Sequence, residues 1–254
     1  MTVRKKTFLI AGCTIVLGLL VAGTLLLFPN YLFAYHENYK KFDIYSGKPI
    51  DARYRSTLDQ SLALAGNSEI FDSSYRYDIF MTKGVWYKPF AETLLGPSLA
   101  RSIDNNILLN DHADFINNEL GTSNKRELMQ TITHEMVHCL MLHKYGMFRI
   151  NPLHHPPLWK VEGYPEFIAL RNDIYRKDYD LRRTIALLKS FIDRGDEWIT
   201  IKQGFADPLL YFKARVMMEF LITKKNMTLD QIMDNSVKED EVYNELIDWY
   251  QHKR

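Results

Sequence analysis

An apolar stretch near the N-terminus, Thr7–Phe28, constrains the fold of this chain more than any other feature, because it carries no charged residue. A helix over this stretch would be roughly 33 Å long, and the hydrocarbon core of a bilayer is about 30 Å thick. The sequence therefore predicts a transmembrane helix over residues 7–28. Arg4-Lys5-Lys6 directly precedes it, and basic flanks of this kind stay in the cytoplasm. Residues 1–6 are expected to be cytoplasmic, and the rest of the chain extracytoplasmic.

Two alternatives to a retained signal-anchor helix stay open. A cleaved signal peptide has an apolar region of about 7 to 15 residues that ends at a small-x-small site. This stretch is longer and lacks a clean Ala-x-Ala at its end. A lipoprotein signal is suggested by Ile10-Ala11-Gly12-Cys13, but only Phe8 and Leu9 precede it as apolar residues. The anchor is favoured, and all three alternatives put the remaining chain outside the cytoplasm.

Aromatic residues follow the apolar stretch at Phe28, Tyr31, Phe33 and Tyr35. Aromatic side chains are enriched where a membrane meets water. These four residues are therefore expected to form an interfacial belt at the outer end of the helix.

Composition limits what the exported part can be. The chain has 32 Lys plus Arg against 31 Asp plus Glu, which gives no basic field for a nucleic-acid partner. Its 46% hydrophobic residues, with 12 Gly and 9 Pro, exclude a disordered or fibrous chain. The two cysteines, Cys13 and Cys139, predict neither a disulfide nor a Cys-rich zinc module. No repeat or linker divides residues 37–254, which are predicted to form one domain.

The first part of this domain carries one helical pattern and several strand patterns. Asp51 is a candidate N-cap for a helix that Gly66 would end. Tyr75–Tyr87 is rich in aromatic and β-branched residues and is interrupted at Lys83-Gly84, which predicts a β-hairpin or two short strands. Ser102–Asn110 is a further strand candidate.

The apolar period becomes helical from Asn124 onward. It predicts a helix over residues 125–145 that ends at Gly146, and Asn124 with Glu127 resembles a capping box. After the proline-rich residues 151–157 the chain is expected to be almost entirely helical. Strands early and helices late predict an α+β fold, a small mixed β-sheet followed by a mainly helical half. The later helices are expected at residues 160–176, 178–194, 207–224, 228–234 and 238–252.

The long helix carries His134-Glu135-Met136-Val137-His138, an H-E-x-x-H array. Residues four apart share one face of a helix, so the imidazoles of His134 and His138 can bind the same ion. Glu135 lies about 100° around the helix from His134, close enough to act on a metal-bound water without becoming a ligand. The array therefore predicts a zinc site.

A catalytic zinc ion needs a third protein ligand and leaves one position to water. The histidine of a longer H-E-x-x-H-x-x-G-x-x-H motif is absent, because Met141 and Lys144 occupy its glycine and histidine positions and His143 is out of register. The other option is a carboxylate on the next helix. Glu162 and Glu166 are four residues apart, so one can ligate the metal while the other accepts a hydrogen bond from a bound imidazole.

The segment with both carboxylates, residues 159–166, reads W-x-x-E-G-x-x-E. It resembles the third-ligand segment of gluzincin zinc metallopeptidases, a superfamily of thermolysin-like and aminopeptidase-like enzymes. The resemblance implies a zincin-like fold with the metal site on the H-E-x-x-H helix. It also implies a role for each residue: Zn²⁺ ligands His134, His138 and Glu162, general base Glu135, and Glu166 as the group that orients a zinc-bound imidazole.

Three further expectations come with this resemblance. Tyr211-Phe212-Lys213-Ala214 is similar to the stretch in which aminopeptidase-like gluzincins carry an oxyanion-stabilising tyrosine. Tyr211 is therefore a catalytic candidate, and an ordinary half-buried tyrosine is the alternative. Residues 107–109 would be the edge strand above the metal helix, where an extended peptide could add. Pro165 departs from the family pattern, and the helix is expected to start only a residue or two before it.

The predicted function is zinc-dependent hydrolysis of a peptide or protein substrate outside the cytoplasm, by a protein held to the membrane through its N-terminal helix. The alternative is an anchored binding or scaffold protein that keeps a peptidase fold with little or no turnover. No Gly-x-Met-x-Asn type amine-binding motif is visible, which argues mildly against an aminopeptidase, while substrate and oligomeric state stay open. The remaining candidates are expected to be surface or loop histidines (His112, His143, His154, His155) and a small buried thiol (Cys139).

Overall fold

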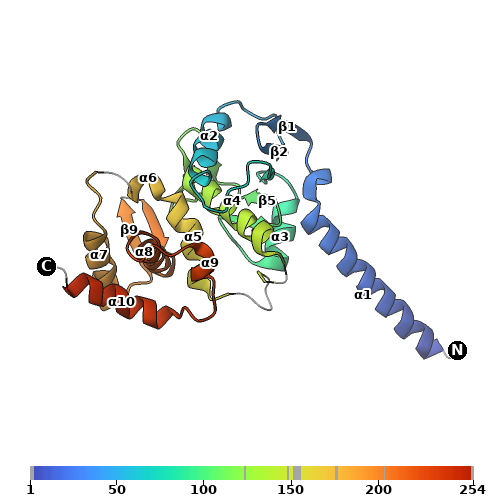
Figure 1. The fold of residues 1–254 in the computed structure, drawn as a ribbon. Helices are drawn as coiled ribbons and strands as arrows, with labels where there is room; N and C mark the ends of the chain where they lie inside the picture. The colour runs from blue at the N-terminus through green and yellow to red at the C-terminus, as the bar shows by residue number, and fades with distance from the viewer. Residues whose placement is uncertain are drawn as a thin grey trace.

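The computed structural model describes residues 3–122, 124–147, 149–150, 156–174, 177–202 and 204–252. It begins with helix α1 (Val3–Leu27) and a short 3-10 helix, η1 (Pro29–Leu32). A strand-rich half follows, and then a mainly helical half (Figure 1). The predicted α+β order is confirmed.

Five strands form the main sheet, in the order β1-β2-β3-β5-β4. The three inner strands are parallel to one another, and both outer strands are antiparallel to their neighbours. The sheet is therefore mixed, as predicted. Its strands are β1 (Tyr35–Tyr39), β2 (Phe42–Ser46), β3 (Tyr77–Met81), β4 (Ala100–Ile103) and β5 (Asn106–Leu109).

Both faces of this sheet are covered, and alternating side chains serve the two sides. Ile79 and Ile107 belong to the main core, which includes residues of α2 (Tyr54–Ala65) and α4 (Leu128–Tyr145). Phe80 and Leu108 belong to a second cluster with residues of α3 (Tyr87–Leu95), packed against Leu32 of η1. Figure 1 shows α4 and α1 on opposite sides of the sheet. Neighbouring residues on one strand thus stabilise two separate layers.

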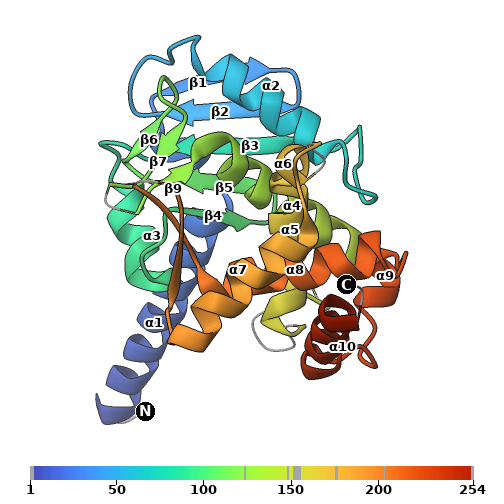
Figure 2. The same cartoon turned by 90° about the vertical axis from the view of Figure 1, so that its left-hand side faces the viewer.

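The helical half packs beside α4. Helix α5 lies between α4 and α8, and α7 and α10 pack against α8 (Figure 2). These helices are α5 (Leu158–Ala169), α6 (Arg171–Ile174), α7 (Leu181–Arg194), α8 (Leu209–Thr223), α9 (Leu229–Ile232) and α10 (Glu239–His252). The smaller sheets are formed by β6 (Ala113–Asp114), β7 (Glu119–Leu120) and β8 (Arg126–Glu127), and by the hairpin of β9 (Trp198–Lys202) and β10 (Phe205–Pro208).

Two strand predictions are wrong in detail. Tyr75–Tyr87 does not form a hairpin, because the chain leaves β3 at Met81, turns at Gly84 with a φ of 75° and enters α3. Both edges of β3 are already paired with parallel neighbours, so no return strand is needed. Ser102–Asn110 contributes to two strands, β4 and β5, which turn around Asp104 with a φ of 57°.

Helix α4 begins three residues later than the sequence predicts. Arg126–Glu127 pairs with β7 as strand β8, and Lys125 bridges to Phe205. The capping box expected at Asn124 and Glu127 is absent, because Glu127 is the N-cap and its side chain makes no capping hydrogen bond. Tertiary strand pairing therefore overrides the local capping signal. The same pairing involves the hairpin β9–β10, which the expectation of an almost entirely helical second half missed.

Pro165 lies well inside α5, which begins at Leu158. The expectation that the helix starts one or two residues before this proline is therefore wrong. A proline in a helix interior removes one backbone hydrogen bond and is costly. Trp159, Tyr164 and Phe167 on the same helix are each almost fully buried, and tertiary packing of this kind supplies most of a helix's stability.

Helix α1 is long and apolar enough to cross a membrane, with a mean hydropathy of 2.4 over Ile10–Leu27 and no buried residue in that window. Its last turn contacts the domain. The side-chain amide of Asn106 donates a hydrogen bond to the Leu27 carbonyl (2.9 Å), and the Tyr87 hydroxyl donates to the Leu26 carbonyl (3.4 Å). These bonds satisfy carbonyls that a helix C-terminus leaves unpaired.

Phe33, expected in the interfacial belt, instead packs in the second core cluster. Its ring lies 5.1 Å from that of Phe80 and 6.1 Å from that of Tyr87. Phe28 and Tyr31 are exposed. The belt prediction is therefore wrong for Phe33, because its ring packs between the sheet and α3.

Gly163 sets how closely α5 and α8 approach. A Cβ atom at this position would lie 2.7 Å from the carbonyl oxygen of Ala214, so we expect Gly163→Ala to lower the free energy of unfolding by about 1–3 kcal/mol. Gly66→Ala is the matched control, because its Cβ would be no closer than 3.3 Å to any atom. Thermal unfolding of the detergent-solubilised protein measures both. Equal stability of the two variants would contradict this account.

Candidate metal centre

Three side chains from two helices converge at one point of the main core. His134 and His138 come from α4, and Glu162 comes from α5. One ligand atom of each lies within 4.8 Å of the others, so the group could hold a metal ion. The three ligand candidates that the sequence predicts are therefore brought together.

The separations between the donor atoms suit a small ion. His134 Nε2 lies 2.9 Å from His138 Nε2, and Glu162 Oε2 lies 3.2 Å and 3.3 Å from these two nitrogens. Donor atoms bound tetrahedrally at zinc distances of roughly 2.0–2.1 Å are about 3.3 Å apart. Two imidazoles and one carboxylate, with a position left for water, are also a ligand set that catalytic zinc sites use. The residues present fit a zinc ion.

Each half of this group has a simple structural origin. The spacing of four residues puts both imidazoles on one face of α4. Glu162 reaches them because α5 packs against α4 along one side and against α8 along the other. The next residue, Gly163, contacts the backbone of Ala214 on α8. The close approach of α5 and α8 at this glycine helps to fix the position of Glu162 along α4.

Glu166 orients the first imidazole. Its Oε1 lies 3.0 Å from Nδ1 of His134. A carboxylate at Nδ1 favours the tautomer with the proton on that nitrogen, which leaves the Nε2 lone pair free for a metal. The sequence alone left the division of roles between Glu162 and Glu166 open. In the structure Glu162 belongs to the group that could hold an ion, and Glu166 lies at the other nitrogen of His134. The roles that the resemblance implies stay a prediction.

Arg126 and Asp207 extend this arrangement, and the sequence reading missed both. Arg126, on β8, contacts Glu166 through Nη2 and Asp207 of β10 through Nε, at 2.9 Å for the second pair. All three side chains are largely buried. Arg126 and Asp207 lie in short strands without a motif, so only the tertiary pairing of β8 with β10 brings them together.

The electrostatics of the centre favour positive charge at His134. Burial lowers the pKa of His134, but Glu166 and Glu162 raise it more, to about 10. Burial raises the pKa of Glu166, but Arg126 and His134 lower it more, to about 2. Burial also raises the pKa of Glu162, and hydrogen bonds with both histidines bring it well below its usual value. Two ionised carboxylates beside the buried imidazole of His134 provide the field that a divalent cation requires.

Glu135 and Tyr211 lie beside the donor group. Glu135 is buried and directly follows His134 on α4. The ring of Tyr211, on α8, stacks 6.3 Å from the ring of His134. Burial and the nearby Glu162 raise the pKa of Tyr211 to about 12, so its hydroxyl stays protonated at neutral pH and can donate a hydrogen bond. Every predicted site residue thus belongs to one cluster.

The other histidine and cysteine candidates do not join this cluster. His143 lies on the surface with its Nε2 3.3 Å from Asp72, and Cys139 is a free, buried thiol, as predicted. His154 and His155 lie outside the described residues. Residues 107–109 form part of β5, which is an inner strand, and the edge beside α4 is β4. The prediction that residues 107–109 form the edge strand is therefore wrong, because the edge strand is β4, which precedes β5 in the same hairpin.

Comparison of the chain with protein-family models, with curated proteins and with solved structures finds no match.

Glu166→Gln tests the orienting contact. The amide keeps the shape of the side chain but removes the charge beside His134 Nδ1, so we expect zinc affinity to fall about 10- to 100-fold. Glu219→Gln is the matched control, because Glu219 is also buried and paired with an arginine, Arg215 (3.0 Å), on α8. Competition with a chromogenic chelator measures both affinities. An equal loss in the two variants would assign the effect to general loss of structure.

Proposed function

We propose that this protein is a membrane-anchored, zinc-dependent peptidase of gluzincin type, whose domain acts outside the cytoplasm. The observation that carries the proposal is the convergence of His134 Nε2, His138 Nε2 and Glu162 Oε2 within 3.3 Å of one another. Glu135 is the sequence neighbour of one of these donors and is available as a base. A structural site would more often use all four positions for protein ligands, and only three donors converge here among the described residues.

Each side chain of the cluster has a chemical task in peptide hydrolysis. A zinc ion at the three donors would supply Lewis-acid chemistry and lower the pKa of water. Glu135 accepts the proton of the attacking water and returns it to the leaving amine. The Tyr211 hydroxyl donates a hydrogen bond to the oxygen on which negative charge develops. The Glu166 carboxylate, 3.0 Å from Nδ1 of His134, would favour the tautomer with the proton on that nitrogen, and Arg126 keeps Glu166 ionised.

The edge strand β4 supports a peptide as the substrate. It is the outermost strand on one side of the main sheet and packs against α4, the helix that carries both imidazoles. An extended segment that pairs with such an edge gains main-chain hydrogen bonds whatever its side chains are. A peptide bound in this way would run alongside the metal helix.

The orientation in the membrane follows from charge. Arg4-Lys5-Lys6 lies at the N-terminal end of α1, and basic flanks are retained in the cytoplasm. The domain at the other end of α1 is therefore proposed to be extracytoplasmic. Contacts of Asn106 and Tyr87 with the last turn of α1 favour retention of this helix over its removal as a signal peptide.

Metal content is the first test of the proposal. We expect about one zinc ion per chain in the wild type, and its loss in His138→Ala and Glu162→Ala, because each variant leaves only two of the three donors. His143→Ala is the control, since this histidine lies on the same helix but pairs with Asp72 at the surface. Elemental analysis of the purified full chain reads out all four proteins. A folded wild type that cannot be loaded with zinc would contradict the metal site.

Glu135→Gln separates binding from chemistry. The variant keeps all three donors, so we expect it to retain zinc but to lose about 10²- to 10⁴-fold in the rate of peptide hydrolysis, the usual contribution of a general base. A peptide-library screen with the wild type identifies a substrate, and the variant is then assayed on it. Full activity of Glu135→Gln would refute this role. A zinc-loaded wild type that binds peptides but hydrolyses none would favour the scaffold alternative.

A further inference from the structure

Helix α3 carries an apolar stripe whose two ends are exposed. Trp86 at its N-cap is 61% exposed and Leu94 near its end is 49% exposed. Phe90 lies between them, with its ring stacked 5.3 Å from that of Trp86. A spacing of four residues puts the three side chains along one side of the helix. The core contacts of α3 are made mainly by Tyr87 and Ala91, and Phe90 is half-buried against the same cluster, so the exposed parts of the stripe are its two ends.

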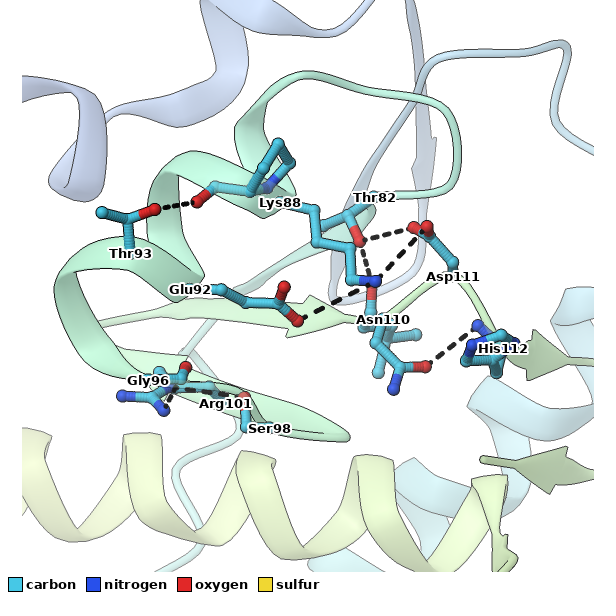
Figure 3. Close-up of polar contacts among 12 residues, drawn as sticks. Thr82, Lys88, Glu92, Thr93, Gly96, Ser98, Arg101, Asn110, Asp111 and His112 are labelled. Atoms are coloured by element: carbon cyan, nitrogen blue, oxygen red, sulfur yellow. Dashed lines mark hydrogen bonds and ion pairs between the residues drawn. The ribbon is translucent and has the colours of Figure 1, made fainter. Parts of the chain in front are cut away.

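The charged residues of α3, Lys88 and Glu92, lie half-exposed on another flank of the helix. Figure 3 shows Lys88 and Glu92 on the flank directed toward the end of β5. Lys88 Nζ lies 3.4 Å from Asp111 Oδ2 and 3.8 Å from Glu92 Oε1. A helix at a water-exposed surface places its charges outward. The ends of the stripe are therefore exposed apolar groups, while the charges of α3 are paired with each other and with Asp111 on another flank. This pattern suits contact of the stripe with something other than water.

The position of α3 identifies that contact. Tyr87, the residue after Trp86, donates its hydroxyl to the carbonyl of Leu26, which lies in the last turn of α1 and inside the apolar window Ile10–Leu27. Trp86 therefore lies beside the end of the stretch that can cross a membrane. Figures 1 and 2 both show α3 next to this end of α1.

Other exposed residues around the junction have the same character. Phe28 and Tyr31 follow α1 directly and are 59% and 86% exposed. Lys83, in the turn before α3, is exposed as well. Aromatic side chains are enriched at the depth of the lipid headgroups, and a lysine there keeps its charged end in water while its apolar stem lies along the interface. The junction thus combines the groups that an interfacial segment uses.

We propose that α3 is an interfacial membrane helix, with the stripe Trp86–Phe90–Leu94 embedded among the lipid headgroups and upper acyl chains beside α1. The occupant is the bilayer, because Tyr87 ties α3 to the end of the apolar window of α1, and this inference rests on the proposed membrane anchoring through α1. Stripes of this kind bind an interface through buried apolar area. Helix α1 and helix α3 then give the domain two points of attachment, which set its orientation.

The test uses tryptophan fluorescence of the full chain in phosphatidylcholine vesicles. Lipids with bromine on the upper acyl chain quench only tryptophans close to them, so we expect Trp86→Phe to abolish most of the quenching that brominated lipid causes. Trp198→Phe is the matched control, because Trp198 is similarly exposed (46%) but lies on β9. It should leave the brominated-lipid quenching unchanged.

A second variant reads the other end of the stripe without removing a native ring. Leu94→Trp should increase quenching by brominated lipid, and its added emission should resist quenching by aqueous iodide. Strong iodide quenching of Trp86 in vesicles, or unchanged lipid quenching in Trp86→Phe, would overturn the proposal. The proposal would also be overturned if iodide quenched the Leu94→Trp emission as strongly as that of Trp198. That result would mean that the stripe faces water or a site for a soluble partner.

Discussion

The buried guanidinium of Arg126 holds the candidate centre together. It pairs with Glu166 on one side and with Asp207 on the other, and Glu166 in turn contacts Nδ1 of His134. These four side chains come from β8, α5, β10 and α4. Removing one partner of a buried ion pair costs about 3–5 kcal/mol, because it leaves the other charge uncompensated. The strand pairing of β8 with β10 and the packing of α5 on α4 are therefore interdependent.

This dependence explains how much of the site the sequence could predict. The pairs His134/His138 and Glu162/Glu166 each follow from the period of one helix, so a local pattern is enough to find them. Arg126 and Asp207 have no such pattern, because they lie in short strands that pair only in the folded chain. The helix start predicted at residue 125 was wrong for the same reason, since β8 occupies residues that have acceptable helical signals.

The fold itself was predictable in class but not in topology. The change from strand to helical periodicity marked the α+β order correctly. The parallel pairing of β3 with β2 and β5 joins segments that are far apart in the sequence, and nothing local encodes it. Tyr75–Tyr87 was interpreted as a hairpin because aromatic and β-branched residues favour strands. Its second part instead leads into α3, where Tyr87 and Trp86 serve two different contacts.

Helix α3 illustrates why an apolar pattern alone does not say what a surface faces. Tyr87 and Ala91 pack on the sheet, and the parallel stripe of Trp86 and Leu94 stays open, although both stripes have the same spacing. The ion pair of Lys88 with Asp111 and the contact of Tyr87 with Leu26 are the features that distinguish the two stripes. On β5, Ile107 packs in the main core and the next residue, Leu108, packs in the second cluster on the other face of the sheet. One sheet thus supports the metal helix on one face and the proposed membrane contact on the other, so the bilayer and the candidate centre are held apart by its thickness.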